Sequence, residues 1–363
     1  MSCPKRIDRA GIVSTPPPMP SKPPSEPAQK PSSSRARISQ IGSMESSVSN
    51  RIRSTTHGHT MKIAILRADV LLLLTAIIWG LGFVAQKAGM ETLGPYTYTA
   101  VRFLIATLAL LPLLLLRPAS GATRTSPTSR RALVVGGGLA GVAITAGGLL
   151  QQVGIDSTTA SNAGFITSLY VVLVPILGLT VGYRILPRTW LGIILATVGL
   201  YLLSIYDLSR VRMGDLLVFL GTIAWAVQVL LIGWATMRAD PIRLTIIQSL
   251  VATGLCLIAA LIMEGFPLEA IWETRWYLLY SGIMATSVAF TFQIIGQRSA
   301  PPAHAAMLLG LEAVFAAIAG YLLLDDRLGG VQLVGCGLML LAVLSCQTGR
   351  GTRTPFLPEG SRR

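Results

Sequence analysis

Long apolar runs separated by short charged breaks dominate the chain from Val70 onward. Each run is about 16 to 22 residues long, which is the helix length that about 30 Å of hydrocarbon requires. The runs are apolar on every face, whereas a membrane strand would alternate apolar and polar residues over about ten positions. The pattern therefore predicts an all-α membrane protein with ten transmembrane helices, at Val70–Ala88, Tyr96–Leu116, Ala132–Val153, Asn162–Tyr183, Trp190–Tyr206, Leu216–Ala235, Ile242–Ile262, Trp276–Gln297, Pro302–Leu323 and Val331–Cys346.

Composition agrees with a membrane protein and argues against a soluble enzyme. Apolar residues make up 52% of the chain and charged residues only 13%, whereas soluble domains carry about 25% charged residues. The formal net charge is +14, but the basic residues lie in the tails and in short loops, as they do in membrane proteins. A nucleic-acid partner is therefore not expected.

Residues 1–60 differ from the rest because they are rich in proline, serine and basic residues. Such a stretch cannot bury enough apolar surface to offset the entropy of ordering, so we expect a disordered basic tail. It also lacks the apolar core of a signal peptide. Two interpretations stay open: a genuine cytoplasmic tail, or an upstream extension with Met61 as the true start. A cytoplasmic C-terminal tail is expected over residues 347–363.

The distribution of Lys and Arg predicts the orientation, because short cytoplasmic loops are enriched in both. Nine basic residues fall in the even-numbered gaps between helices and five in the odd-numbered ones. Both termini add further basic residues to the even side. The bias therefore predicts that the N- and C-termini face the cytoplasm, with the loops around Asp156 and Glu269 outside.

The second half of the helical region repeats the first. With an offset of 146, Asp69 matches Asp215, Trp79 matches Trp225 and Thr107 matches Thr253; with an offset of 142, Gln151 matches Gln293 and Gly178 matches Gly320. We expect two repeats, over residues 68–206 and 213–346. Five helices in each would insert the second repeat upside down, and inverted repeats are typical of secondary transporters. The alternative is a duplicated membrane enzyme or receptor scaffold without transport activity.

Several segments resemble the EamA domain of the drug/metabolite transporter superfamily. They are Trp79–Phe83, Val101–Phe103 and Asn162–Val172 in the first half, and Ala303–Ala306, Leu311–Ala316 and Leu324–Leu328 in the second. The resemblance covers about residues 68 to 346. It implies a bacterial inner-membrane permease that moves small metabolites or drugs, often outward, by alternating access. The sequence departs from the family pattern at Ala313, where a proline is usual, at Asp326, where a glutamate is usual, and near Tyr183, where the first-half counterpart of that glutamate would fall.

Two ionisable residues lie within predicted helices and are candidates for the substrate or ion pathway. Arg102 lies one to two turns into the second helix, and Glu312 lies close to the middle of the ninth. A lone buried charge is costly, so the two pair with each other, or each faces water, or Glu312 is protonated at neutral pH. In the functional interpretation Glu312 is a proton or substrate-cation switch and Arg102 is a gate or an anion contact. In the alternative, Arg102 reaches the headgroups and Glu312 ties helices together.

A set of neutral polar and aromatic side chains completes the candidate site. Its members can hydrogen-bond or stack on a solute without a permanent charge, and they are Gln151, Gln293, Gln248, Asn162, His304, Trp79 and Trp225. Glutamines also link membrane helices at about 0.6 to 2 kcal/mol per hydrogen bond, and the tryptophans could pack against neighbouring helices instead.

Motifs for catalysis, metals and cofactors are missing from the sequence. The three histidines, His57, His59 and His304, form no metal-binding pattern, and there is no GxxxxGK[ST] phosphate loop. The four cysteines, Cys3, Cys256, Cys336 and Cys346, are widely scattered and interpreted as unpaired thiols. We therefore expect no enzyme activity, cofactor or metal. The expected partners are a small-molecule substrate, the lipid bilayer and, in the coupled case, protons; the sequence indicates no particular oligomeric state.

Overall fold

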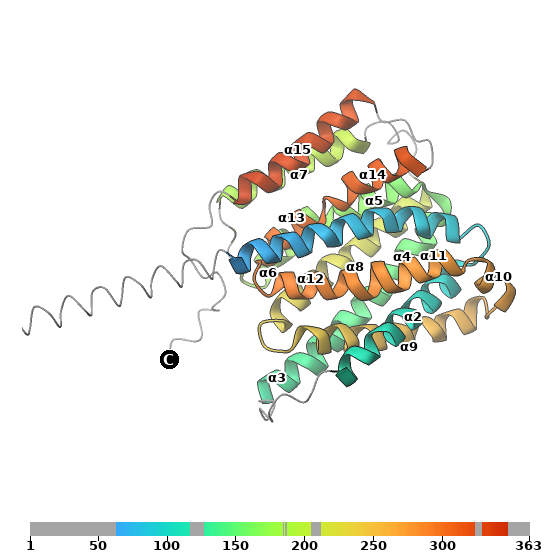
Figure 1. Cartoon of the computed structure of the whole chain (residues 1–363). Helices are drawn as coiled ribbons and strands as arrows, with labels where there is room; N and C mark the ends of the chain where they lie inside the picture. The colour runs from blue at the N-terminus through green and yellow to red at the C-terminus, as the bar shows by residue number, and fades with distance from the viewer. Residues whose placement is uncertain are drawn as a thin grey trace, which may run out of the picture. The chain divides into compact units, whose positions relative to one another are not determined.

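The computed structural model describes residues 63–116, 127–183, 185, 187–204, 212–323 and 329–347. Every regular element in these ranges is a helix (Figure 1). The expected tails and the segment Leu324–Leu328 lie outside the described residues, apart from Gln347. The helices are Ile63–Gly89, α2 (Pro95–Leu116), α3 (Pro127–Arg131), η1 (Ala132–Gly136), α4 (Gly137–Ser157), α5 (Ala160–Ser168), α6 (Tyr170–Thr180), α7 (Pro187–Ser204), α8 (Met213–Ala235), α9 (Pro241–Met263), α10 (Leu268–Glu273), α11 (Arg275–Leu279), η2 (Tyr280–Val288), α12 (Ala289–Gln297), α13 (Pro302–Leu309), α14 (Glu312–Leu323) and α15 (Gly330–Gln347).

Each of the ten predicted runs contains a helix. Eight helices in the described ranges are long and apolar enough to cross a membrane, and two shorter apolar helices cover Thr189–Leu203 and Gly330–Ser345. The prediction of an all-α membrane protein is confirmed. The boundaries moved most at the first helix, which begins at Ile63 rather than Val70.

Two of the predicted helices are interrupted. The fourth breaks at Leu169, between α5 and α6, and the ninth breaks at Gly310 and Leu311, between α13 and α14. Each still forms one apolar helix long enough to cross a membrane, at Ala160–Thr180 and Pro302–Leu323, with a short turn inside it that the sequence did not predict. Glu312 follows the turn in the ninth helix as the first residue of α14.

Local signals in the loops determine where several helices begin. Asp240 caps α9 by accepting from Arg243 N at 3.0 Å, and Thr159 caps α5 by accepting from Asn162 N at 3.1 Å. The α2 helix is capped from a distant loop, because the Glu264 carboxylate accepts from the backbone N–H groups of Tyr96 and Thr97 at 3.2 and 2.8 Å. These caps satisfy helix N–H groups that have no partner within the helix.

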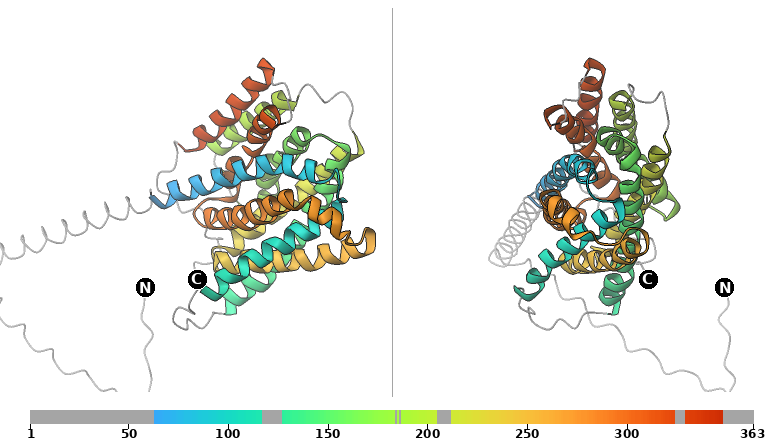
Figure 2. Two further views of the ribbon diagram at one scale, coloured as in Figure 1. Left: turned by 45° about the vertical axis from the view of Figure 1, so that its right-hand side comes forward. Right: turned by 90° about the vertical axis from the view of Figure 1, so that its right-hand side faces the viewer.

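The two repeats pack through equivalent pairs of helices. The α2 and α9 helices cross at Thr107 and Thr253, whose hydroxyl oxygens lie 2.9 Å apart. The α7 and α15 helices lie side by side at one edge of the body (Figures 1 and 2). Each pair contains one helix from either repeat, so contacts between the halves hold the body together.

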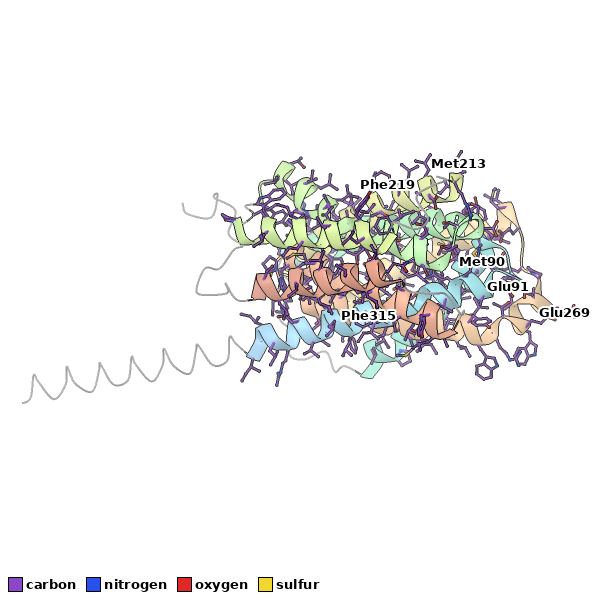
Figure 3. All side chains as sticks on the ribbon, turned by 90° about the horizontal axis from the view of Figure 1, so that it is seen from above. Met90, Glu91, Met213, Phe219, Glu269 and Phe315 are labelled. Carbon is purple, nitrogen blue, oxygen red and sulfur yellow. The ribbon has the colours of Figure 1, made fainter. Side chains whose placement is uncertain are left out.

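The first helix of each repeat begins at an opposite end of the body. Near the end of Ile63–Gly89, Lys87 Nζ donates to the carbonyls of Ile155 and Asp156 at 2.9 and 3.1 Å. That region also meets the start of α8, because Thr158 Oγ1 donates to Asp215 at 2.6 Å. The first helix therefore ends where α8 starts, and Figure 3 shows Met90 and Met213 toward the same end.

Candidate functional site

A pocket lies at the centre of the body. Its lining comes from the helix Ile63–Gly89 and from α2, α4, α5, α6, α8, η2, α12 and α14, and therefore from both repeats. Trp79, which lines it, lies ten residues after Asp69 and eight before Lys87, so the pocket is near mid-depth. Ligand sites of secondary transporters lie at this depth between the repeats.

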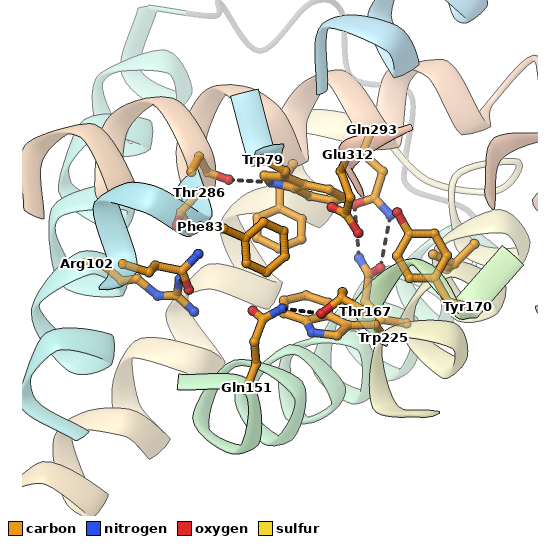
Figure 4. Close-up of a pocket in the computed structure, with 15 residues that line it drawn as sticks. Trp79, Phe83, Arg102, Gln151, Thr167, Tyr170, Trp225, Thr286, Gln293 and Glu312 are labelled. Atoms are coloured by element: carbon orange, nitrogen blue, oxygen red, sulfur yellow. Dashed lines mark hydrogen bonds between the residues drawn. The ribbon is translucent and has the colours of Figure 1, made fainter. Parts of the chain in front are cut away.

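Aromatic side chains form one wall of the pocket. The ring centroids of Trp79 and Trp225 are 6.4 Å apart, and Phe290 lies 5.2 Å from Trp79 and 5.8 Å from Trp225. Trp79 Nε1 donates to the Ala285 carbonyl at 2.7 Å, which orients its ring. Phe83 projects toward the same space (Figure 4). This wall offers an apolar body of a solute a stacking surface.

The π-helical segment η2 brings polar backbone and side-chain groups to this wall. Ala285 and Thr286 both line the pocket, and Thr286 Oγ1 donates to the Ser281 carbonyl at 2.7 Å. Single π-helical turns occur often at functional sites, because the wider turn displaces the backbone locally.

Glu312 lies at one end of the pocket, where the break between α13 and α14 places it. Its side chain is buried, with 2% exposed, and Oε1 has no hydrogen-bond partner in the part of the chain that the structure describes. Tyr170 lies beside the carboxyl group and is the side chain that can hydrogen-bond with it. Glu312 and Tyr170 follow the breaks of the two interrupted helices and are 142 residues apart, so they occupy equivalent positions in the repeats.

Arg102 lies on the opposite side of the pocket from Glu312 (Figure 4). The guanidinium Nη1 donates to Gln86 Oε1 at 2.9 Å, and its carbon lies 5.1 Å from the Phe103 ring centroid. Arg102 Nε is buried without a hydrogen-bond partner. Of the interpretations open for these charges, an Arg102–Glu312 ion pair is not among the contacts of the described residues. The Arg102 side chain is buried within the protein, with 5% exposed.

Glutamines from both repeats line the remaining sides. Gln151 Nε2 donates to Thr167 Oγ1 at 2.8 Å, and Gln293 Nε2 donates to Gln228 Oε1 at 3.0 Å. Gln248 is 146 residues after Arg102 and therefore its repeat counterpart. It does not line the pocket but accepts from Gln228 at 3.3 Å. It supports the lining from behind.

The structure places two predicted site residues away from the pocket. Asn162 Nδ2 donates to Asp215 Oδ1 at 2.7 Å, and His304 Nε2 lies 3.0 Å from Asp69 Oδ1. Neither Asn162 nor His304 is among the lining residues. Asn162 and His304 each lie in the first turn of a helix, near an end of the body. Their polar side chains therefore lie at a different depth in the membrane from the pocket.

Sequence reasoning missed several lining residues. Tyr170, Phe83, Phe290 and Thr167 were not proposed, because aromatic residues and threonines in apolar runs are most often explained by packing. The offset of 142 that pairs Tyr170 with Glu312 is the one signal that would have identified the tyrosine.

In the described ranges there is no group of three or more His, Cys, Asp or Glu side chains placed to hold a metal.

Comparison with known proteins agrees with this architecture. An uncharacterized transporter of Archaeoglobus fulgidus is 33% identical over 288 residues, covering 77% of this chain and 85% of its own length. The uncharacterized inner membrane transporter YedA of Escherichia coli K12 is 25% identical over 285 residues, covering 76% and 88%. A solved crystal structure with 15% identity superposes with a TM-score of 0.60 over 77% of this chain and 96% of that one, which shows a shared fold.

A family model decides between a transporter and a membrane scaffold. The model of the EamA-like transporter family matches residues 66–205 and again residues 212–346. The two matches cover most of the chain and all of the pocket lining. This multi-pass membrane protein therefore belongs to the EamA-like transporter family.

Proposed function

We propose that this transporter carries a small organic solute with an apolar body and charged groups at both ends through the central pocket. The observation that carries the proposal is a set of three buried polar atoms around one cavity, each without a hydrogen-bond partner among the described residues: Glu312 Oε1, Arg102 Nε and Trp225 Nε1. Leaving such groups unpaired costs about 1 to 3 kcal/mol each. A bound solute that meets them recovers this free energy.

The placement of the charges supports a solute with separated charges. Glu312 offers an acceptor to an ammonium group, and Arg102 offers a donor to an anionic group on the other side of the aromatic wall. Trp79, Trp225 and Phe290 then enclose the apolar part between them. Amphiphilic amines that carry an anionic group at the other end have this chemistry, whereas a neutral sugar would leave both charges unpaired.

Transport proceeds by alternating access, with the repeats rocking about the pocket and exposing it to each side in turn. We place the protein in the bacterial inner membrane, as the name of the Escherichia coli relative suggests. The direction that the family resemblance favours is outward. A proton that binds Glu312 when the solute leaves would couple export to the proton gradient.

Solute flux in proteoliposomes tests the proposal. We expect the purified protein to exchange radiolabelled amphiphilic amines that carry a distal anionic group across the bilayer, and not neutral sugars. A Trp79→Ala/Trp225→Ala variant should lose most of the exchange, because the aromatic wall contributes about 0.5 to 1.5 kcal/mol per ring contact beyond its buried area. The matched control is Trp272→Ala, which removes an exposed tryptophan outside the pocket. Equal flux of sugars and amines, or no flux at all, would contradict the proposal.

The orientation has its own test. In a background without cysteines, Asp156→Cys should react with a membrane-impermeant maleimide added to the periplasmic side, and Arg124→Cys should not. Asp156 is exposed, so its replacement by cysteine is accessible to the reagent. The opposite labelling pattern would reject the orientation.

A further inference from the structure

Two polar contacts outside the pocket link the first helix of one repeat to the fourth helix of the other. At the first, His304 Nε2 at the start of α13 lies 3.0 Å from Asp69 Oδ1 of the helix Ile63–Gly89. At the second, Asp215 Oδ1 of α8 accepts from Thr158 Oγ1 at 2.6 Å and from Asn162 Nδ2 of α5 at 2.7 Å. We call these the Asp69 contact and the Asp215 contact.

The two contacts are images of each other under the internal repeat. Asp69 and Asp215 are 146 residues apart, and Asn162 and His304 are 142 residues apart, which are the two offsets that align the repeats. A carboxylate on the first helix thus meets a nitrogen donor on the fourth helix of the opposite repeat in both cases. The contact is present in both copies although the donor differs.

The contacts lie on opposite sides of the pocket. Asp215 is bonded to Thr158, two residues after Asp156, whose carbonyl accepts from Lys87. Asp69 precedes Lys87 by 18 residues of the same helix, so it lies about 27 Å away along that helix. Trp79, in the pocket wall, lies between them.

Each contact also joins the two halves that must separate for the pocket to open. Asp69 and His304 are 8% and 6% exposed, so their contact is itself shielded from water. Asp215 is less buried, and its Oδ2 additionally accepts from Arg212 N at 2.9 Å, which caps its own helix. Capping of α8 accounts for the hydrogen bond that Asp215 Oδ2 accepts. It does not account for the hydrogen bonds that Oδ1 accepts from the other repeat.

We propose that the Asp69 contact and the Asp215 contact are the two gates of the transporter, one at each membrane face. The inference rests on the proposed function, because gates have meaning only if the pocket opens alternately. Opening toward one face breaks the contact at that face while the other stays formed. Asp69, His304, Asp215, Asn162 and Thr158 are positioning residues: they hold the halves together and do not touch the solute.

The test measures from which face the pocket is reached. The reporter is Ala285→Cys in a background with Cys3, Cys256, Cys336 and Cys346 replaced by serine; Ala285 lines the pocket and is 8% exposed. A membrane-impermeant maleimide is added to right-side-out and to inside-out vesicles, and the ratio of the two labelling rates is recorded. A ratio is independent of expression level and needs no known substrate.

Weakening the Asp69 contact should shift the ratio of labelling rates in one direction, and weakening the Asp215 contact should shift it in the other. His304→Ala should increase labelling from the face of Asp69, and Thr158→Ala/Asn162→Ala should increase labelling from the face of Asp215, each by about tenfold, as expected when a hydrogen bond to a charged group is lost. His304→Asn should restore the ratio of the unaltered reporter protein, because Asn162 makes the equivalent contact in the other repeat. The matched controls are Asp156→Asn, an exposed carboxylate near Thr158, and Asp240→Asn, an N-cap of α9; both should leave the ratio unchanged.

Shifts in the same direction, or no shift in either variant, would overturn the assignment, since a purely structural role would loosen both faces alike. A failure of the proposed function looks different. In that case the unaltered protein shows no flux in proteoliposomes, whatever the labelling ratios are.

Discussion

Glu312→Gln is expected to abolish solute accumulation driven by a pH gradient while exchange of solute without a gradient continues. Glutamine has nearly the shape of the protonated carboxyl group but cannot release a proton. The fold should survive, because the structure gives Glu312 no ion pair among the described residues whose loss would strand a charge. The measurement is uptake into proteoliposomes across a range of imposed pH gradients, with Glu269→Gln, an exposed carboxylate on α10, as the control.

Two results would contradict this expectation. If Glu312 holds Arg102 in the folded protein, Glu312→Gln leaves a buried charge unpaired at a cost of several kcal/mol. Yield would then fall together with transport, and adding Arg102→Gln would restore part of the yield. Unchanged transport with an unchanged pH profile would instead leave Gln151, Gln293 and the aromatic wall as the site.

Gly335→Val is expected to destabilise the protein by separating α7 from α15. A Cβ atom at Gly335 would lie 2.6 Å from the Gly199 carbonyl oxygen and 2.8 Å from Leu203 N. Both are backbone atoms, which cannot turn aside as a flexible side chain can. Overpacking of this kind costs about 1 to 3 kcal/mol, so the Tm of the protein in detergent should fall by several degrees.

A matched control for this variant lies in the same helix. Gly337 is two residues away, and a Cβ atom added there would have no atom of a neighbouring element within 4 Å. Gly337→Val should therefore leave the Tm close to that of the unaltered protein. Equal Tm values for the two variants would show that the close approach of α7 and α15 does not contribute to stability.

The sequence was most informative about the helices and least informative about their interruptions. Apolar run length predicts a membrane helix because the bilayer demands it, and all ten runs contain one. The breaks at Leu169 and at Gly310 and Leu311 fall within apolar sequence, with no proline at either break to mark them. A linear pattern of apolar residues therefore gives no signal for them.

The candidate site was predicted in part for a similar reason. Residue type within a predicted membrane helix was enough to select six residues that line one pocket: Glu312, Arg102, Gln151, Gln293, Trp79 and Trp225. Asn162 and His304 were grouped with them on polarity alone, although both are at helix starts. The residue type shows only that a polar side chain inside the membrane needs a polar partner. Whether that partner is a solute in the pocket or another side chain depends on how deep in the membrane the residue lies.

The contact between Thr107 and Thr253 has a consequence for the origin of the chain. Each is the thirteenth residue of its helix, and the two are images of each other under the repeat. A residue that touches its own image lies on the symmetry axis, and such a contact is isologous, the kind by which two identical subunits associate. The two repeats of this single polypeptide therefore meet through the kind of interface that would join two identical subunits in antiparallel orientation. Two separately expressed halves, each with five helices, have the complementary surfaces needed to reassemble.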